Sequence, residues 1–485
     1  MKKFLQERKR FIYLVSPALI GAAFLFLCFT NLNQSVSYPE SYNLYQTRSD
    51  IASIWDSSIS NAQQPPLYLL ILKTWTHFIG HNVPTARALS AILGAAAIVF
   101  AFIWLKYKYG STVAIVSSFM LAISPFFIHC GQEISPAALS IAIIFAATLF
   151  LQLAVDNGRK VWWIIYTLLI IAGMLTSYYS AFVWLAHLAY LAAIYRKKLF
   201  QQKFIYIYLL PIVMYIPWMF SSNYGSSVEL SIPGVASIFT KALLYDQAAN
   251  ASNWLLIPFL FEIILLVILA IRFHQKTRML TALVTAPIIA AILLSLPPLK
   301  TVLSSESIVC SMVVLNMLAG ALLVLFAREL FKKKRKKSKK IWLRHPEIKV
   351  TIASILVIIV PIIGVTSVYT KGNYDFESGK KPTAAVLFEN VVTLDRNENL
   401  SIVTLSRDTY YELSAYESYH HDVHWLNRIN LDEFLENRDA IWLTDVAPTS
   451  GTFNFSYEGW RVSMIANMKF DDAGEPYQIL KLERE

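Results

Sequence analysis

Long apolar runs separated by short polar segments make up the first 370 residues of the chain. A helix of ~20 apolar residues, rising about 1.5 Å per residue, crosses the hydrocarbon layer of a bilayer. The first run has no small-x-small cleavage site after it, which indicates an anchor rather than a signal peptide. We therefore expect a mainly α, polytopic membrane domain over residues 1–370. Its eleven predicted spans lie near residues 11–30, 85–105, 111–129, 136–154, 161–178, 180–195, 204–221, 254–271, 279–296, 308–327 and 349–369.

The longest segment between two predicted spans, residues 31–84, contains a shorter apolar stretch, "PPLYLLILKTWTHFIG" (65–80). Its apolar residues recur at helical spacing, Pro66 suits a first helical turn, and Gly80 suits a C-terminal cap. A helix of about 14 residues is too short to span a bilayer. We therefore expect a helix that lies on the outer membrane surface.

Residues 371–485 have a different, polar pattern, which predicts a separate extracytoplasmic domain. "LSIVTLS" and "DAIWLTDV" are typical of short buried strands, whereas "DTYYELSAYESYHH" and "NLDEFLEN" are typical of helices with Asp at or near the N-cap. Because strand and helix patterns alternate, we expect a small α/β or α+β domain.

Charge placement predicts the orientation of the membrane domain. With a cytoplasmic N-terminus, the inside segments hold 27 Lys and Arg residues and the outside segments before residue 370 hold five. This follows the positive-inside rule and places the C-terminal domain outside the cell. The net charge is +20 over residues 1–370 and −9 over residues 371–485. The basic run "KKKRKKSKK" (332–340) has no interleaved aromatic residues, so we attribute it to orientation and lipid headgroups rather than to nucleic-acid binding.

Two carboxylates stand next to predicted outer span ends and are candidates for chemistry. Glu40 lies in "SYPESYNLYQTRSD" (37–50) and Glu133 in the turn "HCGQEISP" (129–136). If these segments converge on one cleft, the two side chains would take a proton from an incoming hydroxyl or hold a divalent cation such as Mg or Mn. For four other acids we prefer the simpler interpretation that they lie in solvated outer loops and have no chemical role. They are Asp50, Asp56, Glu229 and Asp246.

The order of these segments resembles the GT-C glycosyltransferases, multi-spanning enzymes that use polyprenyl-phosphate sugars. The protein-mannosyltransferase, aminoarabinose-transferase and Rgt-like bacterial groups are the most similar, and many of them carry an exported domain like residues 371–485. The resemblance rests on weak motifs spread over nearly the whole chain. They are "YPESYNLYQTRS…QQPPLYLLILKTWTHFIGHNVPTARALSAILG", "SPFFIHCGQEISPAALSIAIIFAATLFL", "LIIAGMLTSYYSAFVWLAHLAYL", "SSESIVCSMVVLNMLAGALL", "NLSIVTLSRDTYYELSAY" and "YEGWRVS…YQILKLE".

The resemblance implies transfer of a sugar from a polyprenyl-phosphate donor in the plasma membrane to an extracytoplasmic glycan, lipid or protein. Glu40 would act as base or metal ligand, and Glu133 would support it. Transfer also needs positive charge to stabilise the departing phosphate. The residues that the resemblance assigns to substrate binding are Gln64, Gln132, Tyr42, Lys300 and Glu306.

The chain departs from the family pattern at several of these positions. Pro39 stands where the family has its catalytic Asp, and Gln64 replaces the His of a His-Pro-Pro. Ser135 and Ser307 replace two arginines, and Ala137 replaces a Tyr. A non-catalytic relative that binds lipid-linked sugar or a partner protein is therefore an open alternative. A transporter is less favoured, because no paired Gly/Pro-broken spans occur in matching halves.

The segment "YHHDVHW" places His420 and His424 four residues apart, a spacing that can bind zinc on a helix. The sequence offers no evident third ligand. We therefore expect a solvated turn here.

Overall fold

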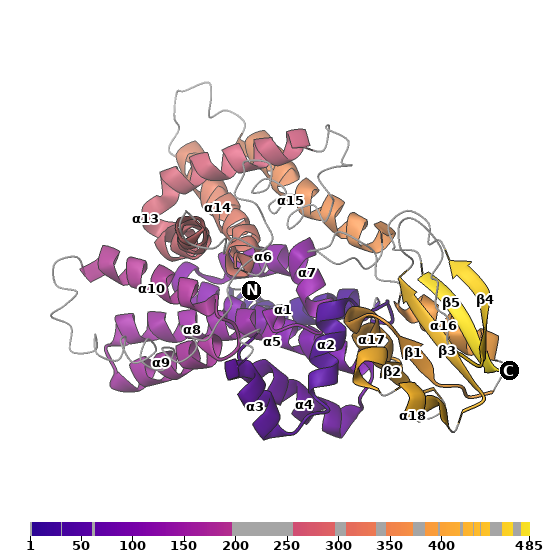
Figure 1. Cartoon of the computed structure of the whole chain (residues 1–485). Coiled ribbons are helices and arrows are strands. Elements are labelled where there is room, and N and C mark those ends of the chain that lie inside the picture. Colours follow the sequence, from indigo (N-terminus) through magenta and orange to yellow (C-terminus); the bar gives the residue numbers. More distant parts are fainter. Residues whose placement is uncertain are drawn as a thin grey trace. The chain divides into compact units, whose positions relative to one another are not determined.

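The computed structural model describes most of the chain, and Figure 1 shows the course of the backbone. Its helices and strands are labelled as in that figure. The described residues are 2–30, 32–60, 64–195, 256–295, 307–335, 346–371, 384–395, 398–417, 421–429, 431–436, 438–446, 458–468 and 477–485. The predicted span 204–221 and the predicted site residues Lys300 and Glu306 lie outside them.

The chain divides into two compact units, each built from three separate segments. The helical unit comprises residues 1–30, 52–68 and 88–370. The mixed unit comprises residues 31–51, 69–87 and 371–485. Residues 371–485, expected as a separate domain, therefore form one compact unit with two pieces of the first predicted outer loop.

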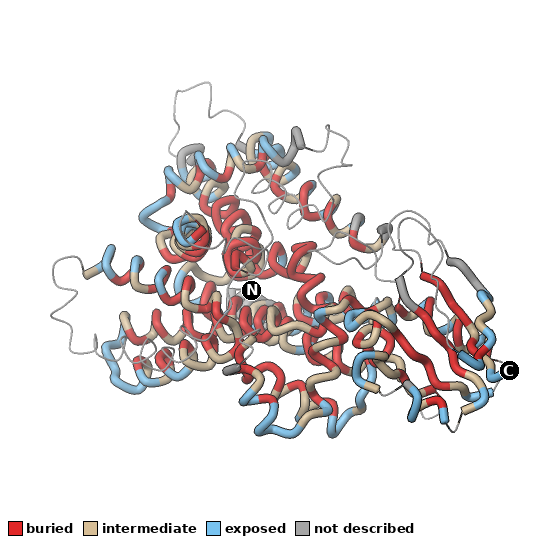
Figure 2. The backbone as a smooth tube through the Cα atoms, viewed as in Figure 1, coloured by how far each residue is buried: buried red, intermediate tan, exposed pale blue. Residues whose placement is uncertain are grey.

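The described apolar runs of the first 371 residues form helices, but the predicted count of eleven spans is not confirmed, because α9 and α10 have only 15 and 16 residues. Five of those described are long and apolar enough to cross a membrane, namely α5, α8, α13, α14 and α15, and α6 with α7 is a bent sixth candidate. α14 is mostly buried within the unit, whereas α13 and α15 expose apolar residues along their length, as lipid-facing helices do (Figure 2). Their bounds are α1 Lys2–Phe29, α5 Val83–Tyr109, α6 Ser111–Ala122, α7 Pro125–Gln132, α8 Ala137–Asn157, α9 Lys160–Met174, α10 Ser180–Tyr195, α13 Leu256–Leu294, α14 Val309–Arg335 and α15 Pro346–Lys371.

Helix α13 contains two of the predicted spans, 254–271 and 279–296. Helical hydrogen bonding continues between them, and Thr277, with φ −108° and ψ 15°, marks a kink. α13 therefore consists of two helices joined at a kink in the predicted inside segment 272–278, and each of them corresponds to one predicted span.

The predicted span 111–129 is a broken helix, bent by 61° between α6 and α7. Pro125 disfavours a helical conformation at the preceding residue, and Ser124 is extended with φ −68° and ψ 120°. α7 then continues to Gln132, so the expected turn at 129–136 begins only at Glu133.

The predicted loop 31–84 contains more helix than its polar character suggested. The stretch 37–50, interpreted as a loop, forms α2 (Tyr38–Gln46), and α3 spans Ile51–Ser60. The predicted surface helix is confirmed as a helix, α4 (Leu67–Ile79), with Gly80 after it at φ 135°. Its position on a membrane surface stays a prediction.

The mixed unit contains a five-stranded sheet with the order β2-β1-β3-β5-β4. β1 is parallel to both β2 and β3, and β5 is antiparallel to both β3 and β4. The predicted strands in 400–406 and 439–446 are confirmed as β1 (Ile402–Thr404) and β3 (Ala440–Val446). The remaining strands are β2 (Val423–Trp425), β4 (Trp460–Met468) and β5 (Tyr477–Arg484).

Helices cover both faces of this sheet. α16 (Ala384–Asp395) and α17 (Arg407–Ser414) bury Leu387 and Leu413 against one face, and α18 (Leu431–Glu436) buries Leu435 against the other. The two predicted helices are thus confirmed, although α17 ends seven residues before the end of its stretch. The domain is an α/β layer structure around a mixed sheet.

The histidine-rich segment is neither a zinc-binding helix nor a solvated turn over its described residues. His424 lies in β2, and His421 is buried with Nε2 3.1 Å from Asp395 Oδ2. Asp395 also accepts hydrogen bonds from Trp442 Nε1 and from the backbone N–H groups of Asn399 and Leu400. His420 lies outside the described residues.

Candidate active site

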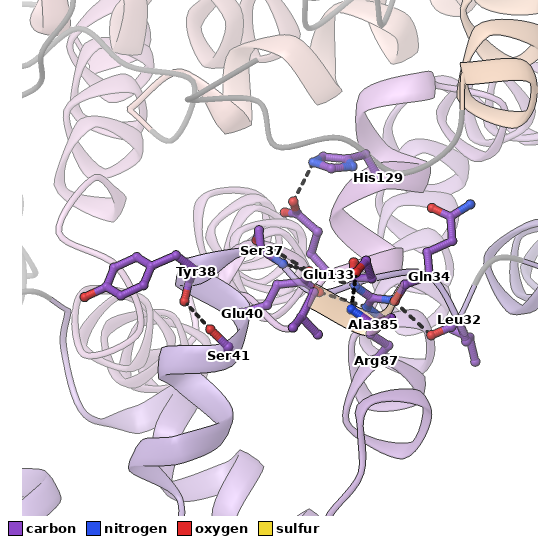
Figure 3. A network of polar contacts seen from close by, with 12 residues as sticks. Leu32, Gln34, Ser37, Tyr38, Glu40, Ser41, Arg87, His129, Glu133 and Ala385 are labelled. Atoms are coloured by element: carbon purple, nitrogen blue, oxygen red, sulfur yellow. Dashed lines mark hydrogen bonds and ion pairs between the residues drawn. The ribbon is translucent and has the colours of Figure 1, made fainter. Parts of the chain in front are cut away.

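Glu40 lies in the first turn of α2, where its carboxylate is buried in a two-bond ion pair. Arg87 Nε donates to Oε1 at 2.8 Å and Arg87 Nη2 donates to Oε2 at 2.8 Å (Figure 3). The same guanidinium donates to the backbone carbonyls of Leu32, Gln34 and Ser35. Arg87 therefore neutralises Glu40 and fixes the chain that leads into α2.

The local sequence explains why Glu40 points inward. Ser37 is the N-cap of α2 and Glu40 is its N3 residue, and the Ser37 backbone N–H donates to Glu40 Oε2 at 3.1 Å. Ser-x-x-Glu is the sequence signature of this capping box. Pro39, at the family's Asp position, adds a residue that is favoured in a first helical turn.

Ala385 and Tyr416, from the C-terminal segment, bind the stretch of chain before α2 that Arg87 also binds. The Ala385 backbone N–H donates to Ser35 Oγ at 2.7 Å. The Val36 backbone N–H donates to the Tyr416 hydroxyl at 2.9 Å. Within the mixed unit, the loop that carries Glu40 is therefore tied to both α16 and the end of α17.

Glu133 lies in the helical unit, at the C-terminal cap of α7. Its Oε1 is 2.7 Å from His129 Nε2, one helical turn earlier, as the dashed line in Figure 3 shows. The imidazole is 3% exposed and the carboxylate 20% exposed. Glu133 therefore presents an accessible carboxylate that a buried imidazole orients.

Packing of α7 against α1 fixes the position of this pair. Gln132 Nε2 lies 3.3 Å from the Leu27 carbonyl and 3.5 Å from the Cys28 carbonyl, near the end of α1, where carbonyl groups lack helical partners. A Cβ on Gly131 would lie 2.7 Å from Cys28 Sγ and 2.8 Å from Phe24 Cζ. Only glycine allows this approach without a shift of the Cys28 and Phe24 side chains.

The other predicted site residues fall into different environments. Tyr42 lies half-buried among the tyrosines of α2 and α17, and Gln64 precedes α4. Ser135 is half-buried, and its Oγ has no hydrogen-bond partner in the structure. Ser307 is buried just before α14. The substrate-binding role of Gln132, whose amide nitrogen binds α1, stays a prediction.

Glu40 and Glu133 belong to different units, so their convergence on one cleft also stays a prediction. Among the described residues, no group of three or more His, Cys, Asp or Glu side chains is placed to hold a metal ion. Their actual partners, Arg87 and His129, were not assigned a role from the sequence. Arg87 is recognisable as a lone cation in an apolar run, and His129 becomes a partner only if α7 continues to residue 132.

Comparisons with known proteins agree with this architecture. The family model described as dolichyl-phosphate-mannose-protein mannosyltransferase matches residues 63–220. A comparison with curated protein sequences gives no match.

Solved structures match over nearly the whole chain. ArnT from Cupriavidus metallidurans bound to undecaprenyl phosphate is 12% identical with a TM-score of 0.55, over 96% of this chain and 97% of that chain. The archaeal oligosaccharyltransferase AglB from Archaeoglobus fulgidus, in complex with an inhibitory peptide and a dolichol-phosphate, is 12% identical with a TM-score of 0.53, over 90% and 69%. This chain therefore has the fold of the GT-C membrane glycosyltransferases. That fold and the apolar helices indicate a multi-pass membrane protein.

Proposed function

We propose that this protein is a membrane glycosyltransferase that moves a sugar from a polyprenyl-phosphate donor to an extracytoplasmic glycan, lipid or protein. The fold shared with ArnT bound to undecaprenyl phosphate, over 96% of the chain, carries this proposal. The excess of cations in the predicted inside segments supports a cytoplasmic N-terminus and an extracytoplasmic mixed unit.

Glu133 is the general base of this proposal. As the acceptor hydroxyl attacks the anomeric carbon, its proton passes to the Glu133 carboxylate, and the bond from that carbon to the phosphate oxygen breaks. The polyprenyl phosphate leaves with the bonding electrons. The hydrogen-bond contact with His129, 2.7 Å long, orients the carboxylate, and its 20% exposure leaves it open to an acceptor.

Glu40 has a supporting role in this account. Both of its oxygens accept hydrogen bonds from Arg87, so a proton or a metal ion would have to displace a donor. We infer that the pair positions the loop before α2. Gln64, Tyr42, Lys300 and Glu306 stay proposed contacts to donor or acceptor.

The test is a transfer assay in reconstituted membranes with Glu133→Gln and Glu40→Gln. We expect Glu133→Gln to lower turnover by about 10²–10⁴-fold with unchanged thermal stability, because the carboxamide cannot accept the proton. The matched control is Glu329→Gln, which removes a carboxylate from a half-exposed ion pair with Arg272 and leaves turnover unchanged. Turnover of Glu133→Gln at the wild-type rate would remove Glu133 from the mechanism.

A non-catalytic relative is the second candidate, and the missing arginines favour it. Ser135 and Ser307 stand at positions where the family has arginine, and Arg87 is committed to Glu40 and three carbonyl groups. Such a protein would bind polyprenyl-phosphate sugars without consuming any of them. Turnover of any donor rules this candidate out.

A further inference from the structure

The mixed unit carries a cluster of aromatic rings, of which only Tyr42 has a proposed role in sugar transfer. Tyr38, Tyr42 and Tyr45 fall at positions i, i+4 and i+7 of α2 and therefore share one helix face. Tyr410 and Tyr411 of α17 pack against that face, with ring centroids 5.6 Å from Tyr45 to Tyr410 and 5.2 Å from Tyr42 to Tyr411. We call these five residues the tyrosine platform.

The tyrosine platform does more than hold α2 and α17 together. Tyr411 is buried at its centre, but the other four rings are only half-buried. The Tyr410 hydroxyl lies 3.2 Å from the Tyr45 hydroxyl, so polar groups line the same surface as the rings. Tyrosine offers an apolar ring and a hydroxyl together, which suits a surface that binds a partly polar ligand.

Three exposed arginines stand at the platform. One of them, Arg48, has its Cζ 5.7 Å from the Tyr45 centroid and is paired with Glu417. Arg428 Cζ lies 5.2 Å from the centroid of the Trp425 ring and 5.9 Å from that of Tyr410. Arg407 Cζ lies 6.0 Å from the Tyr38 centroid, with Asp408 Oδ1 3.6 Å from its Nε.

Arg428 is the stronger candidate for binding an anion. Its described polar contacts are with the Tyr45 and Tyr411 hydroxyls, each at 3.4 Å, and no described carboxylate lies within 4 Å of it. A guanidinium carries five N–H donors. Arg428 therefore keeps donors and an uncompensated charge at the surface, in a segment whose net charge is −9.

We propose that the tyrosine platform and Arg428 form a binding surface for an acidic saccharide, a chain of sugar units that bear carboxylate or phosphate groups. The C–H face of a pyranose packs on the tyrosine rings, and Arg428 binds the acidic group with its planar donors. The ligand is the acceptor only if the proposed sugar transfer holds, whereas binding itself is independent of transfer.

Binding to the full-length protein in lipid nanodiscs, without donor, tests this proposal. The probes are trigalacturonic acid, its trimethyl ester and triglutamic acid, which separate sugar with charge, sugar alone and charge alone. We expect trigalacturonic acid to bind about tenfold or more tightly than either of the other two, because the ester lacks the charge-assisted hydrogen bonds and the peptide lacks the sugar rings.

Variants separate the contribution of the Arg428 charge to binding from that of the tyrosine rings. Arg428→Gln should weaken trigalacturonic acid about tenfold and leave the ester unchanged, and Tyr42→Leu should weaken both. Arg461→Gln, at an exposed arginine of β4, is the matched control and should bind like the wild type. Equal binding of triglutamic acid, or wild-type affinity in Arg428→Gln, would overturn the proposal. Neither outcome bears on turnover, so failure here is distinguishable from failure of the proposed transfer.

Discussion

Arg87 donates to both carboxylate oxygens of Glu40, a residue 47 positions earlier in the chain. The Arg87 side chain is 0% exposed and that of Glu40 is 3% exposed, so both charges are removed from water. Burial of two charges is compensated only by close geometry and further hydrogen bonds. Here the three backbone carbonyls bound to Arg87 and the Ser37 N–H bound to Glu40 supply them. The pair therefore fixes the loop before α2.

Removal of one partner of this pair should destabilise the protein strongly. We expect Arg87→Met or Glu40→Gln to lower the free energy of unfolding by about 3–5 kcal/mol, because each leaves a buried polar group without its partner. The double variant should lose less than the sum of the two, since the charges disappear together. Thermal unfolding of the purified proteins in nanodiscs measures these losses.

The control for this prediction is the pair Arg272–Glu329, which has the same two-bond geometry but is half-exposed. Arg272→Gln should cost at most about 1 kcal/mol. Equal losses in the free energy of unfolding at the two pairs would show that burial does not explain how strongly Arg87 stabilises the protein.

A methyl group against Phe24 of α1, from α5 or from α7, should disturb the proposed site. A Cβ on Gly94 would lie 2.6 Å from Phe24 Cε1, and one on Gly131 would lie 2.8 Å from Phe24 Cζ. We expect Gly94→Ala and Gly131→Ala each to cost about 1–3 kcal/mol through overpacking. Phe24→Leu should recover part of the loss. Thermal unfolding and transfer activity are the measurements.

Gly173→Ala is the control for overpacking, because its Cβ would meet Ile143 and Ser180 at 3.4 Å, an ordinary contact distance. It should leave stability nearly unchanged. Wild-type stability in Gly131→Ala would contradict the close packing of α7 on Phe24.

The buried carboxyl of Asp395 should make the mixed unit sensitive to acid. Burial acts to raise its pKa, but the hydrogen bonds that it accepts from Trp442, His421 and two backbone N–H groups hold the pKa below its usual range. A lowered folded-state pKa gives stability that is present above about pH 4 and is lost as the pH falls through the folded-state value. Thermal unfolding at pH 7, 5, 4 and 3 should show this loss in the wild type.

Asp395→Asn should lower stability at neutral pH and remove that part of the acid dependence. Asp439→Asn, at an exposed aspartate, should leave both unchanged. A wild-type acid profile in Asp395→Asn would show that other carboxyl groups cause the loss.

His129→Leu tests how Glu133 is held. Loss of the imidazole leaves the carboxylate without the partner 2.7 Å away, so the base should lose its orientation. We expect turnover to fall by less than in Glu133→Gln, with His129→Gln intermediate because its amide can still donate. Turnover measured at saturating donor checks this order. Equal turnover in His129→Leu and the wild type would remove the orienting role.

Local patterns predicted much of the fold. The buried runs around Val403 and Leu443 predicted β1 and β3, and the spacing in 65–80 predicted α4. Two features absent from the prediction had visible local signals: Ser37-x-x-Glu40 is the capping box that begins α2, and Ser124-Pro125 marks the break between α6 and α7.

The site was less accessible to sequence reasoning, because its contacts join distant residues. No sequence pattern near Glu40 predicts Arg87 as its partner. None near His421 predicts its network with Asp395 and Trp442. The order of the sheet likewise depends on pairing such as that of Trp442 with Lys481, which the strand patterns do not encode. Residue types indicated acids at the outer face, whereas only the fold shows which of them are already paired.

Release of polyprenyl phosphate tests the central claim most directly. The purified protein in liposomes is given radiolabelled polyprenyl-phosphate sugars and an envelope extract as acceptor, and free polyprenyl phosphate is measured over time. We predict that it accumulates to many times the amount of protein and that Glu133→Gln abolishes this accumulation. Donors that bind in stoichiometric amount but remain intact throughout would contradict the account and identify a binding protein with a glycosyltransferase fold.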